Sequence, residues 1–362
     1  MELRPYRVAV LKGDGIGPEV VAEALKALEA VGRAGGPAWE WAEYPCGAGC
    51  FLAQGNPLPA DTLQACRDAD AVLLGAMGLP HVRWPDGTEM KPQVDLRFQL
   101  DLYAGVRPIY LYASEHSPLK GAAPGSIDLV ILRENVEGLF ASMNGGIELR
   151  GELAVDSMVI TRRGTERVSR YAFGLARARR RQPMKVTCVD KANIFRSMAF
   201  FRRVFDEVAA DFGDVVAEHA YIDALALYMV QRPQSFDVLV MENMYGDIIS
   251  DLAAGLVGGM GMAPSADIGD QTAVFQPSHG TAPDLAGKGV CNPVAAVLSA
   301  AMMLQWLAER HQDERAAWGA GAIRAAVGQV MSVPGNGTPD LGGAMSTAAV
   351  GDAIAAAVGR GA

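Results

Sequence analysis

Short apolar runs alternate with longer amphipathic segments along most of the chain. The runs are rich in β-branched residues, as in buried strands of a parallel sheet, and lie at residues 7–11, 71–74, 127–132, 185–189, 215–218, 236–241 and 273–276. Helices are predicted between them, at residues 18–31, 61–68, 92–103, 165–179, 197–211 and 293–308. This alternation indicates an α/β fold.

The segment FDVLVMENMYGDIISD, residues 236–251, is the centre of the predicted site. Its first half is predicted to be a buried strand and its second half a helix that begins at Gly246. Ligands of open α/β sheets bind at this end of the strands. Asp247 and Asp251 are four residues apart, so they share one face of the helix. The pair suits Mg²⁺ or Mn²⁺, and two solvated carboxylates near a helix N-terminus are the alternative.

Three arginines lie where a predicted element ends or a loop begins: Arg97, Arg107 and Arg133. The planar fork of arginine binds carboxylates through two parallel hydrogen bonds. Three such residues favour a small polyanionic substrate. Three separate surface salt bridges would give the same pattern.

The loop after the first strand resembles a dinucleotide-binding loop but lacks two of its features. Pro18 replaces the third glycine of G-x-G-x-x-G, and no acidic residue ends a second strand at the expected distance. A Rossmann fold is therefore not predicted.

Residues 144–163 contain three glycines and alternating apolar positions without a helical period. This pattern predicts an extended arm or hairpin. An arm of this kind pairs with another strand, and we expect a second subunit to supply it.

Composition narrows the class of protein. With 362 residues, half of them hydrophobic, the chain can form two globular domains. The net charge of −9 and the lack of a basic cluster with interleaved aromatics argue against nucleic acid or membrane as a partner. The densest basic run, residues 177–181, is predicted to be a solvated helix end. The apolar segment 293–308 is shorter than the roughly 20 residues of a membrane span and is predicted to be a core helix.

The cysteines are five in number and scattered: Cys46, Cys50, Cys66, Cys188 and Cys291. They lack metal-ligand spacing and are typical of reduced thiols in the cytoplasm. The first predicted strand begins at residue 7, which leaves no room for a signal peptide. We therefore expect a cytoplasmic protein.

Motifs along nearly the whole chain resemble the β-decarboxylating dehydrogenases, the family of isocitrate, isopropylmalate, homoisocitrate, tartrate and D-malate dehydrogenases. In order they are GDGIGPEV, DLRFQLDLYAGVRP, LRENVEG, VDKAN, YIDALA, NMYGDIISDLAAGLVGGMGMAPSA and HGTAPDLAGKGVCNP. The set as a whole is specific, although no single motif is.

The resemblance implies a two-domain isocitrate/isopropylmalate dehydrogenase-like α/β fold with a large mixed sheet, not a Rossmann fold. Residues 1–102 plus 259–362 would form the cofactor-side domain. Residues 103–258 would form the substrate and dimerisation domain, with a clasp arm at about 140–163 that interlocks in a homodimer. The implied activity is oxidation of a (2R)-malate-type 2-hydroxy acid with NAD(P)⁺ and Mg²⁺ or Mn²⁺, followed by loss of the β-carboxylate as CO₂.

The resemblance also implies roles for single residues. The substrate clamp would be Arg97, Arg107 and Arg133. The metal ligands would be Asp247, Asp251 and, from the second subunit, Asp223. Lys191, also from the second subunit, would act on the hydroxyl proton, because a lysine near a dication is shifted towards its neutral form and can serve as a base.

The cofactor is expected along one loop, at His279, Gly280, Thr281, Ala282, Asp284 and Asn292. Asp284 matches the acidic residue that faces the adenosine ribose in the family. Such a carboxylate accepts hydrogen bonds from the ribose hydroxyls and repels a 2′-phosphate, which favours NAD over NADP.

Two positions depart from the family pattern. Phe140 stands where the family has a tyrosine that protonates the enolate carbon, and a ring without a hydroxyl cannot do so. Residues 90–95 have neither the paired leucines expected for an isopropyl group nor the serine and asparagine associated with isocitrate. Gln93 and Asp95 favour a small polar substituent on C3 of the substrate, or they face solvent.

We therefore expect an NAD- and Mg²⁺-dependent oxidative decarboxylase of the 3-isopropylmalate, tartrate or D-malate class. One alternative is a dehydrogenase that oxidises without completing decarboxylation. Another is a non-catalytic regulatory subunit, against which the presence of Lys191 together with all the aspartates and arginines argues.

Overall fold

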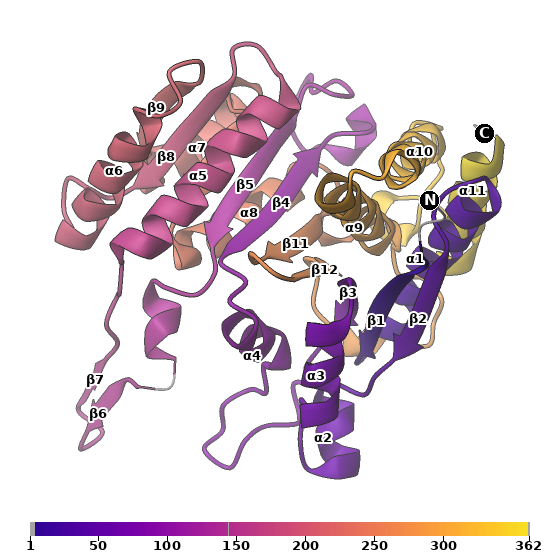
Figure 1. The fold of residues 1–362 in the computed structure, drawn as a ribbon, viewed down its shortest axis with the longest axis horizontal. Coiled ribbons are helices and arrows are strands. Elements are labelled where there is room, and N and C mark those ends of the chain that lie inside the picture. The colour runs from indigo at the N-terminus through magenta and orange to yellow at the C-terminus, as the bar shows by residue number, and fades with distance from the viewer. Residues whose placement is uncertain (1–3, 144, 361–362) are drawn as a thin grey trace. The chain divides into compact units, whose positions relative to one another are not determined.

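The computed structural model describes residues 4–143 and 145–360, so Asn144, the first residue of the predicted arm, lies outside the described residues. Ten strands form one sheet in the order β2-β1-β3-β12-β11-β4-β5-β10-β8-β9 (Figure 1). β4 and β5 are antiparallel, whereas β10 is parallel to both β5 and β8. The predicted α/β class and the large mixed sheet are confirmed.

The chain divides into two compact units. The first comprises the chain up to Leu100, Gly258–Ala266 and the chain from Asp270 onward. Its elements before residue 100 are β1 (Tyr6–Gly13), α1 (Gly17–Arg33), β2 (Trp39–Glu43), α2 (Ala48–Gln54), α3 (Ala60–Asp68), β3 (Ala71–Ala76) and α4 (Pro92–Gln99). Its later elements are β12 (Ala273–Pro277), α9 (Val294–His311), α10 (Glu314–Met331) and α11 (Thr347–Arg360), and β11 (Pro264–Ile268) lies at the boundary of the two units.

Helix α9 is the buried core helix expected for residues 293–308. Most of its residues are buried, and it packs against α1, α10 and β12 within the first unit. No helix in the described part of the chain combines the length and apolarity that a membrane crossing requires.

The second unit comprises Asp101–Val257 with Asp267–Gly269. Its strands are β4 (Ala104–Tyr110), β5 (Asp128–Glu134), β6 (Ile147–Leu149), β7 (Leu153–Val155), β8 (Lys185–Asp190), β9 (Val216–Tyr221) and β10 (Val238–Met241). Its helices are α5 (Arg162–Arg179), α6 (Arg196–Ala209), α7 (Ile222–Gln231) and α8 (Asn243–Gly255). α5 and α6 cover one face of its strands, and α7 and α8 cover the other (Figure 1).

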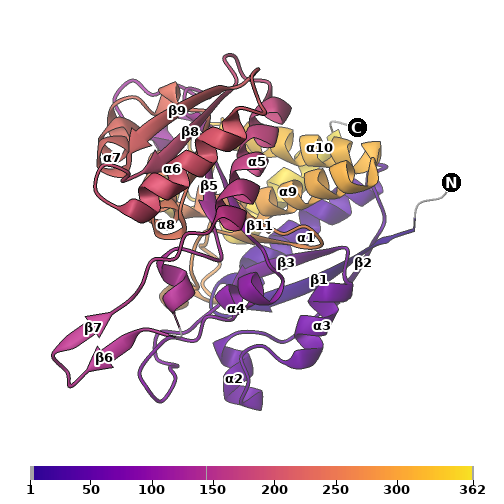
Figure 2. The same cartoon turned by 60° about the vertical axis from the view of Figure 1, so that its left-hand side comes forward.

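The predicted hairpin of the arm is confirmed in its described part. β6 and β7 pair antiparallel, with Glu148 opposite Ala154, and the hairpin stands away from the strands of its own unit (Figure 2). The apolar residues of both strands are exposed.

Three sequence predictions differ from the structure. Helix α4 ends at Gln99 and not at residue 103, and β4, which the sequence does not predict, begins at Ala104. Helix α8 begins at Asn243 and not at Gly246, because the Glu242 side chain caps it. The basic run 177–181 is not simply solvated, since Arg179 is partly buried between the carboxylates of Asp128 and Asp237.

Candidate active site

The carboxyl end of β10 leads directly into α8. Glu242 accepts hydrogen bonds from the backbone N–H groups of Met244 (3.0 Å) and Tyr245 (2.7 Å), which satisfies two free donors of the first turn. Gly246 lets the helix approach β5, because a Cβ there would lie 2.6 Å from the Cβ of Arg133. The helix therefore passes close to the end of β5.

Arg133 is held in one orientation by the residues around it. Its Nε and Nη2 donate to Asn243 Oδ1 at 2.9 and 2.6 Å, and its Nη1 donates to Asp247 Oδ1. The ring of Phe140 covers the guanidinium, with 4.9 Å between Cζ and the ring centroid. The side chain is 2% exposed, so its polar atoms face this site and not bulk solvent.

Arg107 reaches the same helix from inside β4, where it pairs in register with Ile131. The expectation that it lies beside a loop is therefore wrong. Its Nη1 donates to Ser250 Oγ at 2.8 Å, and its guanidinium lies 3.4 Å from a carboxylate oxygen of Asp247 and of Asp251. Two arginines and two aspartates thus form the arginine–aspartate cluster, which consists of Arg107, Arg133, Asp247 and Asp251.

The two sides of this cluster differ in exposure. The arginines are nearly buried, whereas the side chains of Asp247 and Asp251 are 42% and 59% exposed. Burial raises the pKa of Asp251, the charge of Asp247 raises it further, and Arg107 lowers it. The carboxylates are open to a ligand from outside, and a cation there would relieve their mutual repulsion.

The carboxylate oxygens of the cluster suit a hard dication but do not complete its coordination shell. Asp247 and Asp251 offer oxygen ligands of the kind that Mg²⁺ and Mn²⁺ prefer. Among the described residues of one chain, no three Asp, Glu, His or Cys side chains are grouped to hold a metal. Asp223 of the same chain therefore does not join this pair, and a third protein carboxylate would have to come from elsewhere.

Lys191 and Asp223 form their own ion pair. Lys191 follows β8, Asp223 lies in the first turn of α7, and Lys191 Nζ is 2.6 Å from Asp223 Oδ1. The lysine holds the pKa of the Asp223 carboxyl below its ordinary value. Exposed apolar side chains lie within four residues of the pair in sequence, namely Ile194, Phe195 and Leu227.

The remaining predicted residues lie in the first unit. Arg97 is buried on α4. The loop that begins at His279 is joined to the loop after β1, because Ile16 N donates to Thr281 O at 2.9 Å. Gly15 has φ +58°, and a Cβ there would lie 2.1 Å from Thr281 O, so no larger residue fits.

One imidazole nitrogen in this loop lacks a hydrogen-bond partner within the part of the chain that the structure describes. His279 Nδ1 is 2.9 Å from Gly280 O and donates to it, which leaves Nε2 as an acceptor. Nε2 is buried and has no hydrogen bond among the described residues. Burial lowers the pKa of His279, so the ring is neutral at neutral pH. A bound group with a hydroxyl or amino donor would satisfy it.

Two further side chains that the sequence predicts for the cofactor lie on this loop, Asp284 and Asn292. Asp284 is exposed in a short 3₁₀ turn that follows Ala282, whose φ is 37°. Asn292 is buried and fixed, since its Nδ2 lies 3.2 Å from Asp340 Oδ2 and its Oδ1 accepts from Val294 N. Asp284 and His279 therefore offer acceptors that could hold hydroxyl or amino donors of a bound group, whereas the polar atoms of Asn292 are already engaged.

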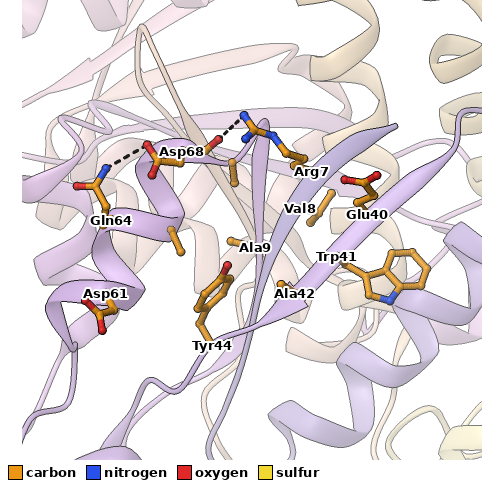
Figure 3. Close-up of a pocket in the computed structure, with 12 residues that line it drawn as sticks. Arg7, Val8, Ala9, Glu40, Trp41, Ala42, Tyr44, Asp61, Gln64 and Asp68 are labelled. Atoms are coloured by element: carbon orange, nitrogen blue, oxygen red, sulfur yellow. Dashed lines mark hydrogen bonds between the residues drawn. The ribbon is translucent and has the colours of Figure 1, made fainter. Parts of the chain in front are cut away.

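A groove of about 450 Å³ elsewhere in the first unit does not have this chemistry. It lies between α3 and the paired strands β1 and β2, and contains none of the predicted site residues (Figure 3). Three of its polar residues bond to one another, because Arg7 donates to Asp68 O (2.8 Å) and Gln64 donates to the Asp68 carboxylate (3.0 Å).

The sequence reading missed two residues of the cluster's surroundings, Asn243 and Ser250. Both lie on the α8 face that carries the aspartates, at spacings of i, i+4, i+7 and i+8. If the helix is taken to begin at Asn243, this spacing identifies all four polar residues from the sequence.

Known proteins resemble this chain over nearly its whole length. The family model described as isocitrate/isopropylmalate dehydrogenase matches residues 7–354. The chain is 45% identical over 345 residues to the 3-isopropylmalate dehydrogenase of Moorella thermoacetica, with 93% of each chain covered. It is 40% identical to the 3-isopropylmalate/3-methylmalate dehydrogenase of Methanocaldococcus jannaschii, over 97% of this chain and 98% of that one.

Among solved structures, the isocitrate dehydrogenase of Methylococcus capsulatus superimposes with a TM-score of 0.87. It is 37% identical, and the match covers 98% of this chain and 99% of that chain. The resemblance inferred from the sequence motifs is confirmed.

Proposed function

Because the chain belongs to the isocitrate/isopropylmalate dehydrogenase family, we propose that it oxidises and decarboxylates a (2R)-malate-type 2-hydroxy acid with NAD⁺ and Mg²⁺ or Mn²⁺. The arginine–aspartate cluster carries this proposal, since buried guanidinium groups lie beside two open carboxylates. Such an arrangement suits a dicarboxylate and a dication bound side by side.

The residues have distinct roles in the reaction. Arg107 and Arg133, with Arg97, hold the substrate carboxylates, and Lys191 accepts the proton of the C2 hydroxyl. Asp247 and Asp251 would hold a dication that would polarise the C2 oxygen, and the loop from His279 would hold NAD⁺ as the hydride acceptor. The C3–carboxylate bond then breaks, CO₂ leaves, and a proton is delivered to C3. The products are a 2-oxo acid, CO₂ and NADH.

The two units divide this work. The first unit, predicted at residues 1–102 plus 259–362, binds the cofactor through His279, Gly280, Thr281, Ala282, Asp284 and Asn292. The orphan Nε2 of His279 and the exposed carboxylate of Asp284 support this role. The second unit, predicted at 103–258, binds the substrate and forms the dimer.

The working form is a homodimer with shared active sites, in which Lys191 and Asp223 act across the interface. Exposed apolar residues on the hairpin, α7 and α8 support an interface on this unit, among them Leu149, Leu227, Val230 and Ile248. The Asp223 of the ion pair with Lys191 lies on α7, the helix that also carries Leu227 and Val230. All five cysteines are free and buried, which supports a cytoplasmic location.

A substrate panel tests the proposal. The purified chain is assayed with D-malate, tartrates, 3-isopropylmalate, isocitrate and homoisocitrate, with NAD⁺ and Mn²⁺, and both NADH and CO₂ are measured. At least one substrate should yield NADH. Absence of NADH from every substrate, with a correctly folded dimer, would overturn the proposal.

A second candidate is oxidation without complete decarboxylation. Phe140 favours it, because this ring lies at the cluster and has no hydroxyl to donate a proton, and an enolate that is not protonated can recombine with CO₂. In that case the CO₂ formed per NADH would stay well below one.

A further inference from the structure

A buried ion pair joins the end of strand β8 to helix α6. Asp190, the last residue of β8, is 0% exposed, and Arg202 of α6 donates to both of its carboxylate oxygens, from Nε at 2.7 Å and from Nη2 at 2.8 Å. Two parallel bonds of this kind fix the direction as well as the distance between an arginine and a carboxylate. Asp190 Oδ1 also accepts from the backbone N–H of Ala192 at 2.8 Å. The pair therefore fixes the residue on each side of Lys191.

The ring of Tyr221 joins the neighbouring strand to this support. Asp190 and Tyr221 are partners in register at the carboxyl ends of the parallel strands β8 and β9. Arg202 Cζ lies 5.1 Å from the centroid of the Tyr221 ring, and Lys191 Nζ lies 5.9 Å from the same centroid. A cation within about 6 Å of an aromatic face is attracted to it. The side-chain nitrogen of Lys191 is therefore placed by this ring and by the carboxylate of Asp223, 2.6 Å away.

Stability alone is a weak explanation for the pair of Arg202 with Asp190. Taking two charges out of water costs free energy that their attraction offsets only in part, so apolar residues of the same size often give equal stability. A forked pair does restrict geometry, and here it restricts the turn that carries Lys191. Lysine has a flexible four-carbon stem, so the position of its side-chain nitrogen depends on where its backbone is held.

We propose that Arg202 and Asp190 are positioning residues for Lys191, which set where its side-chain nitrogen lies and do not bind substrate themselves. This inference rests on the proposed function, in which Lys191 accepts the proton of the C2 hydroxyl in the active site of the other subunit. A base must come within about 2.6–3.2 Å of the oxygen whose proton it accepts. A displacement of about 1 Å can lower the rate about 100-fold.

The first test compares two adjacent arginines of α6. Arg202→Met removes the fork, and Arg203→Met makes the same change at the exposed neighbouring position. NADH bursts are recorded by rapid mixing with NAD⁺, Mn²⁺ and the most active member of the substrate panel. Arg202→Met should lower the burst rate at saturating substrate about 10- to 100-fold. The substrate concentration that gives half of the maximal burst rate should change less than about threefold, because the three substrate arginines are intact. Arg203→Met should match the wild type in both quantities.

Hybrid dimers show whether Arg202 acts through Lys191. In the proposed dimer, Lys191 serves the site that contains the partner subunit's Asp247. A dimer of Arg202→Met with Asp247→Asn therefore has one intact site, and an equimolar mixture should regain about a quarter of the wild-type activity after verified subunit exchange. A dimer of Arg202→Met with Lys191→Ala has no intact site, so this mixture should regain none. A general loss of stability would not separate the two mixtures in this way.

Three results would overturn the inference. One is a burst rate in folded Arg202→Met that equals that of Arg203→Met, and another is recovery of Arg202→Met by Lys191→Ala. The third is no recovery by Asp247→Asn. In all three the proposed function stands, provided that Lys191→Ala and Asp247→Asn recover each other. If those two do not, the shared site of the proposed function fails, and this inference fails with it. Arg202→Lys, which keeps the charge without the fork, serves in place of Arg202→Met if the methionine variant does not fold.

Discussion

Phe140 lies over the guanidinium of Arg133, with 4.9 Å between Arg133 Cζ and the ring centroid. The same guanidinium donates to Asn243 and Asp247, so Arg133 is fixed on its edge by α8 and on its face by an aromatic ring. A cation over a buried aromatic face contributes about 1–2 kcal/mol. A ring with no hydroxyl therefore forms one wall of the proposed substrate site.

Removal of the metal should abolish activity. Asp247 and Asp251 are open carboxylates that repel each other, and a dication between them would supply the missing positive charge. We expect excess EDTA to stop NADH formation and Mn²⁺ or Mg²⁺ to restore it. Asp247→Asn should be inactive at all Mn²⁺ concentrations, whereas the exposed control Asp61→Asn should retain full activity. Full activity in EDTA would contradict the metal site.

Shared active sites predict complementation between two inactive variants. Lys191→Ala keeps Asp247, and Asp247→Asn keeps Lys191. In a mixed dimer, one of the two sites then receives only intact residues. An equimolar mixture should recover about a quarter of the wild-type sites after subunit exchange. Exchange is verified by native mass spectrometry, and no recovery in verified hybrids would count against a shared site.

The sequence predicts the local parts of this site better than the non-local ones. The pairing of Asp247 with Asp251 follows from helical spacing alone, and the structure places both on one face of α8. The start of α8 was missed because glutamate is not among the most common N-cap residues.

The local sequence does not predict that Arg107 and Arg133 lie close together. Arg107 and Arg133 lie on neighbouring antiparallel strands, opposite Ile131 and Gly105 respectively. Glycine and proline in AGVRP indicate a turn, so β4 was not predicted from its own sequence. Only the register with β5 brings the two guanidinium groups to the same helix.

The exposed carboxylate of Asp284 predicts the choice of cofactor. It accepts from ribose hydroxyls and repels a 2′-phosphate, so kcat/KM should be higher for NAD⁺ than for NADP⁺. Each tenfold of preference corresponds to about 1.4 kcal/mol. Asp284→Ser should lower kcat/KM for NAD⁺ and raise it for NADP⁺, so the ratio of the two values should fall. Equal values for the two cofactors in the wild type would contradict the role of Asp284.

Glu134, next to Arg133, predicts how stability depends on pH. Burial raises the pKa of Glu134 to about 7, although its carboxylate accepts from the backbone of Val136 and Glu137. The pKa of an unfolded glutamate is about 4.3. The folded state therefore binds the proton more tightly, and this contribution to stability is present below pH 4.3 and is lost as the pH rises to about 7.

Glu134→Gln should remove that dependence. Between pH 5 and pH 8, the wild type should lose on the order of 2–3 kcal/mol of unfolding free energy that the variant does not lose. Urea unfolding at both pH values measures the difference. Parallel pH profiles for the two proteins would show that Glu134 does not titrate in this range.

Phe140 predicts which step of the reaction is slow. Hydride transfer and loss of CO₂ need no tyrosine hydroxyl, but protonation of C3 afterwards needs a donor. A positioned general acid is typically worth about 10²–10⁴ in rate. The nearby hydroxyl of Ser142 is already engaged with the backbone of Ser157, at 2.6 Å from its carbonyl oxygen, so it does not replace the missing donor. An enolate that is not protonated can recombine with CO₂, so slow protonation lowers both the net CO₂ released and the turnover. Phe140→Tyr should therefore raise the CO₂ formed per NADH, or the steady-state rate, without changing the rate of the first NADH burst.

Phe200, whose ring also lies against arginine side chains, provides the control for Phe140→Tyr. Phe200 lies beneath Arg162 and Arg203, and Phe200→Tyr adds the same hydroxyl on a helix that carries no proposed catalytic residue. It should alter neither the CO₂ yield nor the turnover. The measurement combines rapid-mixing NADH absorbance with CO₂ quantification on the substrate that the panel identifies. If folded Phe140→Tyr left both quantities unchanged or lowered them, protonation of C3 would not be limiting, and Phe140 would serve only to hold Arg133.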